Sequence, residues 1–151
     1  MNKPKRILYP PVWLVIGLVS IFTLSEFAPL ARFNSGFATG LGSFAIIIGL
    51  LLLVHAAGMF KVAETDMIPF QNVTSLVTTG VYRVTRNPMY LGMALVLLGT
   101  SCTVGAATGL LVPPIFMAII EFRFIRPEEA MLRELFGEEF ENYCKLVRRW
   151  L

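Results

Sequence analysis

The stretch that decides the fold is Asn87–Ile120, NPMYLGMALVLLGTSCTVGAATGLLVPPIFMAII, in which 34 consecutive residues carry no charge. As one helix it would be about 51 Å long at ~1.5 Å per residue, whereas the hydrocarbon core of a bilayer is only ~30 Å thick. The chain therefore has to reverse within it. Gly105–Gly109 is its weakest helical part, and Pro113–Pro114 fit the first turn of a following helix. We expect a tight hairpin of two membrane-spanning helices, at about 88–104 and 110–126.

Two earlier stretches, Ile7–Ser25 and Phe33–Phe60, are also free of Asp, Glu, Lys and Arg. Each reaches the ~18 mainly apolar residues that are typical of a spanning helix. They predict spans at about 12–32 and 38–60. The first is expected to be a retained helix and not a cleaved signal peptide, because its apolar run is too long and no small-residue cleavage site follows.

The composition agrees with a membrane protein. Of 151 residues, 56% are hydrophobic and 15% are charged, against ~45–50% and ~25% in an average soluble domain. An ordinary soluble globule is disfavoured by the scarcity of charge, and disorder is excluded by the hydrophobicity. We therefore predict an all-α integral membrane protein with four transmembrane helices and a single domain, residues 1–151.

The basic residues predict the orientation of the four spans. With an even number of spans, twelve of the thirteen Lys and Arg residues fall on one side, and only Arg32 lies opposite. This asymmetry follows the positive-inside rule. Both termini and the loop 61–87 are predicted to be cytoplasmic. The clustering at membrane edges also argues against nucleic acid as a partner, although the net charge is +3.

The segment before the third span has the features of an anion site. Asn87 followed by Pro88 is a helix-start signal, with asparagine as the N-cap. The start of a helix carries partial positive charge, and Arg83 and Arg86 are close by in the sequence. Such a place suits a carboxylate or phosphate. The alternative is that these arginines only meet lipid headgroups.

The C-terminal segment 125–150 predicts a cytoplasmic amphipathic helix. At 100° per residue its large apolar side chains share an arc of about 140°, and Glu128 and Glu129 fall over the same arc. A carboxylate in that place requires a partner. A helix break at Gly137 would change the phase of this pattern. The apolar side chains are Leu132, Leu135, Phe136, Phe140, Tyr143, Leu146, Val147 and Trp150.

Small and ionisable residues within the spans have mainly packing interpretations. Gly36 and Gly40 have small-xxx-small spacing, and Gly92 and Gly99 lie two turns apart on one helix face. His55 is the single histidine, and an intramembrane histidine is either functional or a cross-helix hydrogen-bond partner. No cysteine or histidine spacing predicts a metal site.

Three motifs, taken in order, resemble one superfamily. They are Gly80-x-Tyr82, then Arg86-Asn87-Pro88-x-Tyr90-x-Gly92, and then a pattern that starts at Glu128-Glu129 and ends at Tyr143-x-x-x-Val147-x-Arg149-Trp150. The combination is similar to the isoprenylcysteine carboxyl methyltransferase and phospholipid methyltransferase superfamily, over about residues 64–151. The isoprenylcysteine enzymes typically have histidine at the position of Asn87, whereas phosphatidylethanolamine methyltransferases resemble the Asn-Pro-Met-Tyr form.

The resemblance implies a membrane-embedded methyltransferase that uses S-adenosylmethionine (SAM), with a two-span part, 1–60, and a cofactor-binding part, 61–151. Glu128 and Glu129 are the candidate catalytic bases for an amine acceptor, helped by a raised pKa, and Arg86 is the third candidate catalytic residue. The residues that the resemblance places around SAM are Tyr82, Arg86, Asn87, Pro88, Tyr90, Gly92, Glu128, Glu129, Tyr143 and Arg148 or Arg149.

The acceptor stays open between a prenylated cysteine carboxylate, an aminophospholipid headgroup and a small thiol. Met89, Met93 and Leu97 are possible walls of an apolar acceptor groove, or core residues. The oligomeric state is also open. A rival hypothesis is a non-catalytic scaffold or lipid-binding membrane protein whose basic loop and tail helix only bind anionic lipid. A second rival, a relative of the NADPH-dependent sterol reductases, is disfavoured by the small number of spans.

Overall fold

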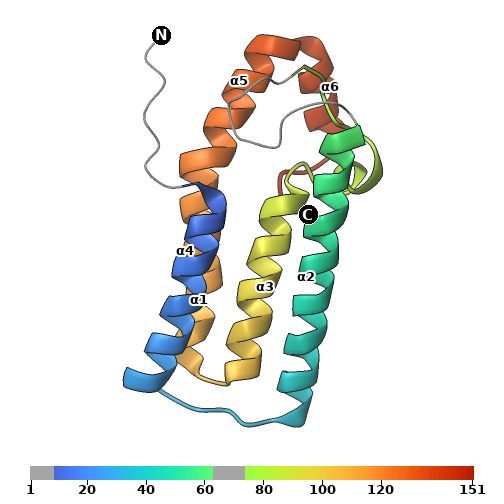
Figure 1. Cartoon of the computed structure of the whole chain (residues 1–151). Coiled ribbons are helices and arrows are strands. Elements are labelled where there is room, and N and C mark those ends of the chain that lie inside the picture. The colour runs from blue at the N-terminus through green and yellow to red at the C-terminus, as the bar shows by residue number, and fades with distance from the viewer. Residues whose placement is uncertain (1–8, 63–73) are drawn as a thin grey trace.

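The computed structural model describes residues 9–62 and 74–151 (Figure 1). Within these ranges the regular structure is helical, apart from an isolated bridge between Arg32 and Ala106. The predictions for Lys3, Lys5, Arg6 and the central part of the 61–87 loop lie outside the described residues. The helices are α1 Pro10–Phe27, α2 Gly36–Val62, η1 Gly80–Arg83, α3 Pro88–Val104, η2 Ala107–Leu111, α4 Val112–Ile120, η3 Glu121–Ile125, α5 Arg126–Phe136 and α6 Glu138–Leu146.

The predicted class, an all-helical membrane fold, is confirmed. Three helical stretches in the described residues are long and apolar enough to cross a bilayer, namely Pro10–Phe27, Gly36–Lys61 and Ala107–Phe136. The remaining predicted span, the third, corresponds to α3, which is apolar but shorter, at 17 residues. It would be about 26 Å long at ~1.5 Å per residue. The exact number of spans stays a prediction.

The hairpin predicted from Asn87–Ile120 is confirmed. Helix α3 ends at Gly105, whose φ of +72° is a left-handed conformation that favours glycine. The backbone of Phe33 also packs directly on Gly105, with its N–H donating to the Gly105 carbonyl at 2.8 Å. Pro113 and Pro114 then lie in the first turn of α4, where proline fits a helix best.

One predicted helix end is wrong, and one helix is longer than the span it contains. The first span was expected to reach residue 32, but α1 ends at Phe27 and Pro29 follows soon after. The fourth span was expected at about 110–126, and its helix continues past that point through the π-turn η3 into α5. Its 30 residues would be about 45 Å long, which exceeds a ~30 Å hydrocarbon core. The α5 end of this helix therefore extends beyond the apolar layer.

The expectation of one continuous amphipathic tail helix is also wrong. Gly137, with a φ of +51°, separates α5 from α6 and resets the helical phase. Two residues of the expected apolar arc are consequently exposed, Leu135 by 54% and Leu146 by 86%. Three other residues of the expected arc, Phe140, Tyr143 and Val147, are buried as predicted and form a small cluster. The cluster packs on Leu76, Leu132, Phe136 and Cys144.

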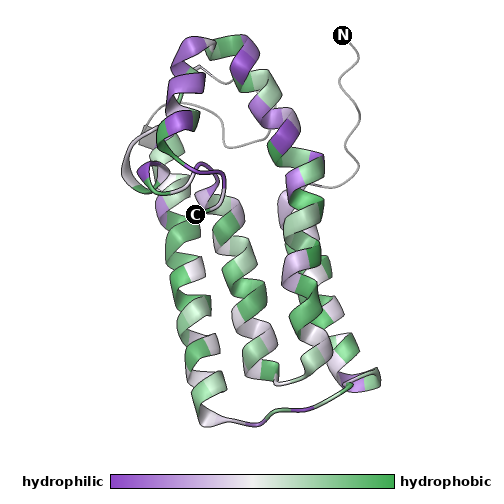
Figure 2. Cartoon of the chain, turned by 180° about the vertical axis from the view of Figure 1, so that it is seen from behind, coloured by the Kyte–Doolittle hydropathy of each residue, from purple (hydrophilic) through white to green (hydrophobic). Residues whose placement is uncertain are grey.

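Helix α3 lies in the middle of the bundle, with α2 on one side and α1 and α4 on the other (Figure 1). Leu97 and Ile120 are fully buried in the core that joins α3 to α1 and α4. Figure 2 shows that the long helices are mainly hydrophobic, whereas hydrophilic residues gather around α5, α6 and the C-terminus. We call this region the α5–α6 end of the bundle.

Glycines allow α2 and α3 to approach closely. A Cβ added to Gly49 would lie 2.7 Å from the Gly92 carbonyl oxygen, and Gly42 and Gly99 face each other in the same way. The packing interpretation of Gly92 and Gly99 is therefore confirmed. Gly40, by contrast, has nothing within 4 Å of its added Cβ.

The glycine contact predicts a difference in stability between two equal substitutions in α2. Gly49→Val forces a side chain against the α3 backbone and should lower the free energy of unfolding by about 1–3 kcal/mol. Gly40→Val meets open space and should change it by less than about 0.5 kcal/mol. Thermal unfolding in detergent measures both. Equal melting temperatures would contradict the close approach of α2 and α3.

Candidate functional site

A pocket of about 450 Å³ lies at the α5–α6 end of the bundle. Its walls come from the start of α1, the end of α2, residues 75–77, η1, the start of α3, the end of η3, α5 and α6. One part is apolar and includes Pro10, Phe60 and Met93. The other part is polar and contains most of the residues expected around SAM. These are Tyr82, Arg86, Asn87, Tyr90, Glu128, Glu129 and Tyr143.

Glu129 is the most buried charged group of the pocket, at 4% exposed. Arg149 binds it in a bidentate manner, with Nε 2.9 Å from Oε1 and Nη2 2.7 Å from Oε2. Arg86 Nη2 lies 3.2 Å from Oε1, and Arg133 is at 3.8 Å. A buried carboxylate loses several kcal/mol of hydration, and this is offset only by close, well-aligned cations. The partner that the sequence required for this carboxylate is therefore present.

These contacts bear on the expected role of Glu129 as a base. Three guanidinium groups around one carboxylate favour its ionised form, and its oxygens are already used by Arg149 and Arg86. Such a group suits charge balance and orientation better than proton abstraction. The expectation that burial would prepare Glu129 as a base is not supported by this geometry.

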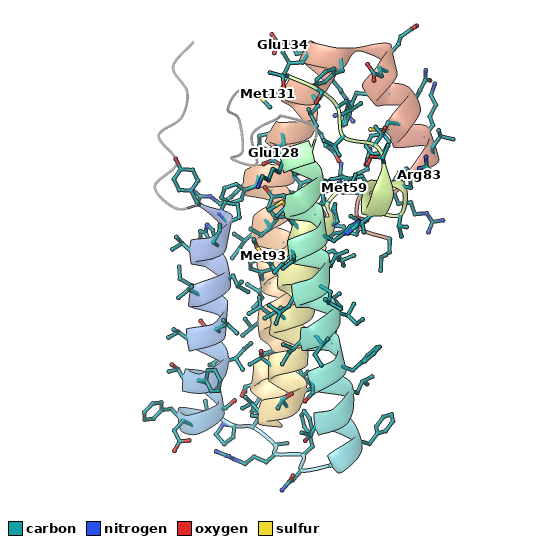
Figure 3. The ribbon with its side chains drawn as sticks, turned by 45° about the vertical axis from the view of Figure 1, so that its right-hand side comes forward. Met59, Arg83, Met93, Glu128, Met131 and Glu134 are labelled. Atoms are coloured by element: carbon teal, nitrogen blue, oxygen red, sulfur yellow. The ribbon has the colours of Figure 1, made fainter. Side chains whose placement is uncertain are left out.

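Glu128 has different surroundings. The hydroxyl group of Tyr90 donates to Glu128 Oε1 at 2.8 Å, which connects α5 to the first turn of α3. In Figure 3, Glu128 and Met131 lie at the α5–α6 end, and Met93 lies deeper along the bundle. Along the bundle, Glu128 therefore lies between two methionines that line the pocket, Met131 and Met93.

The C-terminal residues lie along the segment that precedes α3. The backbone N–H of Arg86 donates to the Arg148 carbonyl at 2.9 Å, and Asn87 Nδ2 donates to the Arg149 carbonyl at 2.9 Å. The hydroxyl group of Thr85, a buried residue, also donates to the Arg149 carbonyl, at 3.2 Å. These backbone contacts place the Arg149 side chain over Glu129.

Asn87 consequently has a role that the sequence did not predict. Helix α3 does begin at Pro88, as expected, but the Asn87 side chain makes no capping hydrogen bond. It points to the C-terminal tail instead. The N-cap prediction is right for the backbone and wrong for the side chain, because a nearby carbonyl group competes for the amide.

Two tyrosines close the polar part of the pocket. The Tyr143 hydroxyl group donates to the Tyr82 carbonyl at 2.6 Å, and the Tyr82 ring packs edge-on against Phe60. Burial raises the pKa of Tyr82 well above its usual range, and nearby Tyr143 and Glu128 raise it further. Burial also raises the pKa of Tyr143. Both phenols therefore stay protonated around neutral pH, and Tyr143 donates its hydroxyl proton to the Tyr82 carbonyl.

Some expected site residues do not line the pocket. Gly92 packs against Gly49 and Leu53 of α2, and Pro88 is a buried first residue of α3. The Arg148 side chain is exposed and contributes only its carbonyl group, so Arg149 is the arginine that reaches the carboxylates. Arg83 is also exposed and points away from the pocket (Figure 3).

The sequence interpretation missed Glu121, which lies 28 residues before Arg149 but contacts it. It also missed the contribution of Tyr9, Pro10 and Pro11 to the pocket. The sequence signal for Glu121 is its position as the first charged residue after a long apolar run. Charged residues at the edge of a membrane span commonly have this position, so the signal does not indicate a functional role.

Comparisons with known proteins agree with this architecture. A family model described as phospholipid methyltransferase matches residues 37–139. An uncharacterized protein of Haemophilus influenzae (strain ATCC 51907 / DSM 11121 / KW20 / Rd) is 38% identical over 63 residues, which cover 42% of this chain and 100% of that protein.

A solved structure has a similar fold. It is the eukaryotic intramembrane Ras methyltransferase, isoprenylcysteine carboxyl methyltransferase, with a TM-score of 0.67 and 21% sequence identity. The match covers 100% of this chain and 53% of that chain. The chain thus spans about half the length of that methyltransferase, and the likeness concerns the fold.

The contact between Asn87 and the tail can be tested by two substitutions. Asn87→Leu removes the donor to the Arg149 carbonyl and should lower the free energy of unfolding by about 1 kcal/mol. Asn87→His offers a ring N–H to the same carbonyl and should retain more of the stability. Thermal unfolding in detergent compares the two with the unchanged protein. A loss of stability that is as large for His as for Leu would contradict this role.

Proposed function

Because the chain belongs to the phospholipid methyltransferase family, we propose that it is a membrane-embedded, SAM-dependent methyltransferase with a lipophilic or small acceptor. The observation that carries the proposal is an ion network at the pocket. Buried Glu129 and Arg86 line the pocket and contact each other, and Arg149, from outside the lining, also binds Glu129. This combination suits a charged methyl donor next to a lipophilic acceptor.

The residues present fit SAM. Its carboxylate needs a cationic partner, and its ammonium and ribose groups need acceptors. Arg86 lies at the pocket, and its Nε is buried without a hydrogen-bond partner in the part of the chain that the structure describes. A buried donor of this kind is rare in a protein unless a ligand or water satisfies it. We assign Arg86 to the carboxylate and Glu128 to the ammonium or ribose groups.

The apolar part of the pocket would receive the acceptor. Met89, Met93 and Met131 line it, and methionine side chains adapt readily to ligands of different shape. Arg126 lies over the exposed Phe122 ring at 4.3 Å, an arrangement typical of a membrane interface. The acceptor would therefore reach the pocket at the level of the lipid headgroups.

When bound, SAM supplies an electrophilic methyl group, whose carbon–sulfur bond breaks as the acceptor's lone pair forms the new bond. The residues of this chain then act mainly by orientation and by exclusion of water, which can contribute several kcal/mol. A carboxylate or thiolate acceptor needs no base. An amine has to lose a proton, and Glu128 is the candidate base, because Glu129 is held by Arg149 and Arg86.

We also propose that the α5–α6 end faces the cytoplasm and that both termini lie on that side. Five of the basic residues at this end are Arg83, Arg86, Arg133, Arg148 and Arg149, as the positive-inside rule requires of the cytoplasmic face. SAM is made in the cytoplasm, so this placement would give it access to the pocket.

The methyl-donor site predicts saturable binding of SAM to the purified protein in detergent. Arg86→Ala and Glu129→Ala should each raise the dissociation constant at least tenfold, roughly the effect of losing one charge-assisted hydrogen bond. Glu134→Ala serves as the control, since Glu134 is exposed on the far side of α5 (Figure 3). Isothermal titration calorimetry measures binding, and thermal unfolding verifies the fold.

If the unchanged protein does not bind SAM saturably, the proposed methyltransferase function is contradicted and the non-catalytic scaffold hypothesis is favoured. Unchanged affinity in both folded site variants would contradict the assignment of the site.

The acceptor class predicts the effect of Glu128→Gln on turnover. Labelled SAM would be offered with aminophospholipid, prenylcysteine and thiol acceptors. If the accepted substrate is an amine, loss of the base should reduce kcat by about 10²–10⁴-fold. If it is a carboxylate or thiolate, the substitution should change kcat far less. An amine acceptor with unchanged kcat would exclude Glu128 as the base.

A further inference from the structure

Glu121 is a partly buried carboxylate that does not line the pocket but is surrounded by donors. Its side chain is 21% exposed. Arg126 Nη2 lies 2.9 Å and Arg149 Nη1 3.0 Å from Oε1, and the indole N–H of Trp150 donates to Oε2 at 3.2 Å. Two of these three residues come from the C-terminal tail. Glu121 is therefore the point at which the tail is attached to the long helix.

Arg149 connects Glu121 to the pocket. One terminal nitrogen of its guanidinium group contacts Glu121, and its other two nitrogens contact the two oxygens of Glu129. Both carboxylates also raise the pKa of Arg149, and the largest cause is the hydrogen bond that Arg149 donates to Glu129. A planar group held on two sides has little freedom to rotate. The orientation of Glu129 therefore depends on Glu121 as well as on its direct partners.

The π-turn explains how two carboxylates so far apart share one guanidinium group. In an uninterrupted α-helix at 100° per residue, positions 121 and 129 would be about 80° out of line. Glu121 is the first residue of η3, where i→i+5 hydrogen bonds wind the chain less per residue. The wider turn rotates Glu121 toward the helix face that carries Glu129. Turns of this type are frequent at functional sites.

We propose that Glu121 is a positioning residue of the methyl-donor site. Through Arg149 it sets the orientation of Glu129, and Glu129 in turn holds the Arg86 guanidinium group at 3.2 Å. The inference rests on the proposed function, because it concerns the binding of SAM. It goes beyond that function, since Glu121 neither lines the pocket nor belongs to the motifs that suggested the site.

The test is a double-mutant cycle on SAM affinity, measured by calorimetry in detergent. Glu121→Gln keeps the shape and an acceptor oxygen but removes the charge, and should raise the dissociation constant about threefold to tenfold. Glu121→Ala should raise it more. In an Arg149→Met background, Glu121→Gln should have no further effect, because the bridge is already absent.

Two controls separate this role from a structural one. Arg126→Gln removes the exposed partner of Glu121 but leaves the contact with Arg149, so the affinity should stay within twofold. Glu134→Gln makes the same chemical change at an exposed position of α5. Thermal unfolding is recorded for each variant. If Glu121→Gln does not fold, Glu121→Asp keeps the charge but shortens the reach, and the same rise is expected.

The outcomes distinguish the two proposals. If the unchanged protein does not bind SAM, the proposed function fails. If it binds SAM and Glu129→Gln weakens binding, but the folded Glu121 variants bind normally, only the positioning role is overturned. Additive effects of Glu121→Gln and Arg149→Met would also overturn it, since Glu121 would then act independently of Arg149.

Discussion

The burial of one charge constrains the rest of this end of the molecule. Glu129 is 4% exposed, and a carboxylate in such a place is stable only with close cationic partners. The chain supplies them from three separate segments: Arg86 before α3, Arg133 one turn further along α5, and Arg149 in the C-terminal tail. The partners of this single carboxylate therefore hold the tail against the start of α3. The hydrogen bonds of Asn87 to the tail and of Tyr143 to Tyr82 belong to the same arrangement.

A membrane protein has to place such a network outside the hydrocarbon layer, because charged groups are costly within it. Extension of α4 through η3 into α5 meets this requirement. The extended helix rises beyond the apolar part of the bundle and carries both glutamates. Below them, α3 is held against α2 by glycine contacts that leave little room for movement. The pocket thus lies directly beyond a closely packed pair of helices.

The elements that could be predicted from the sequence depend on local chemistry. Three features follow from neighbouring residues, and the structure confirms them. They are the reversal within an uncharged run too long for one span, its position at Gly105, and the start of α3 after Asn87. Arg86 was suggested by the start of α3, and the Glu128-Glu129 pair by the pattern of the tail. The family resemblance assigned them to one site, and the structure brings these residues to one pocket.

What could not be predicted depends on rotation about a helix or on contacts between distant segments. Gly137 resets the phase of the tail, so no helical wheel drawn through it could distinguish Arg148 from Arg149. The π-turn changes the direction of Glu121 by an amount that residue types alone do not encode. The Asn87 side chain donates to the Arg149 carbonyl and does not cap its own helix, because the C-terminal tail lies beside it in the fold. In each case the role of a side chain is decided by a partner twenty or more residues away, and a single sequence does not show which distant residue becomes that partner.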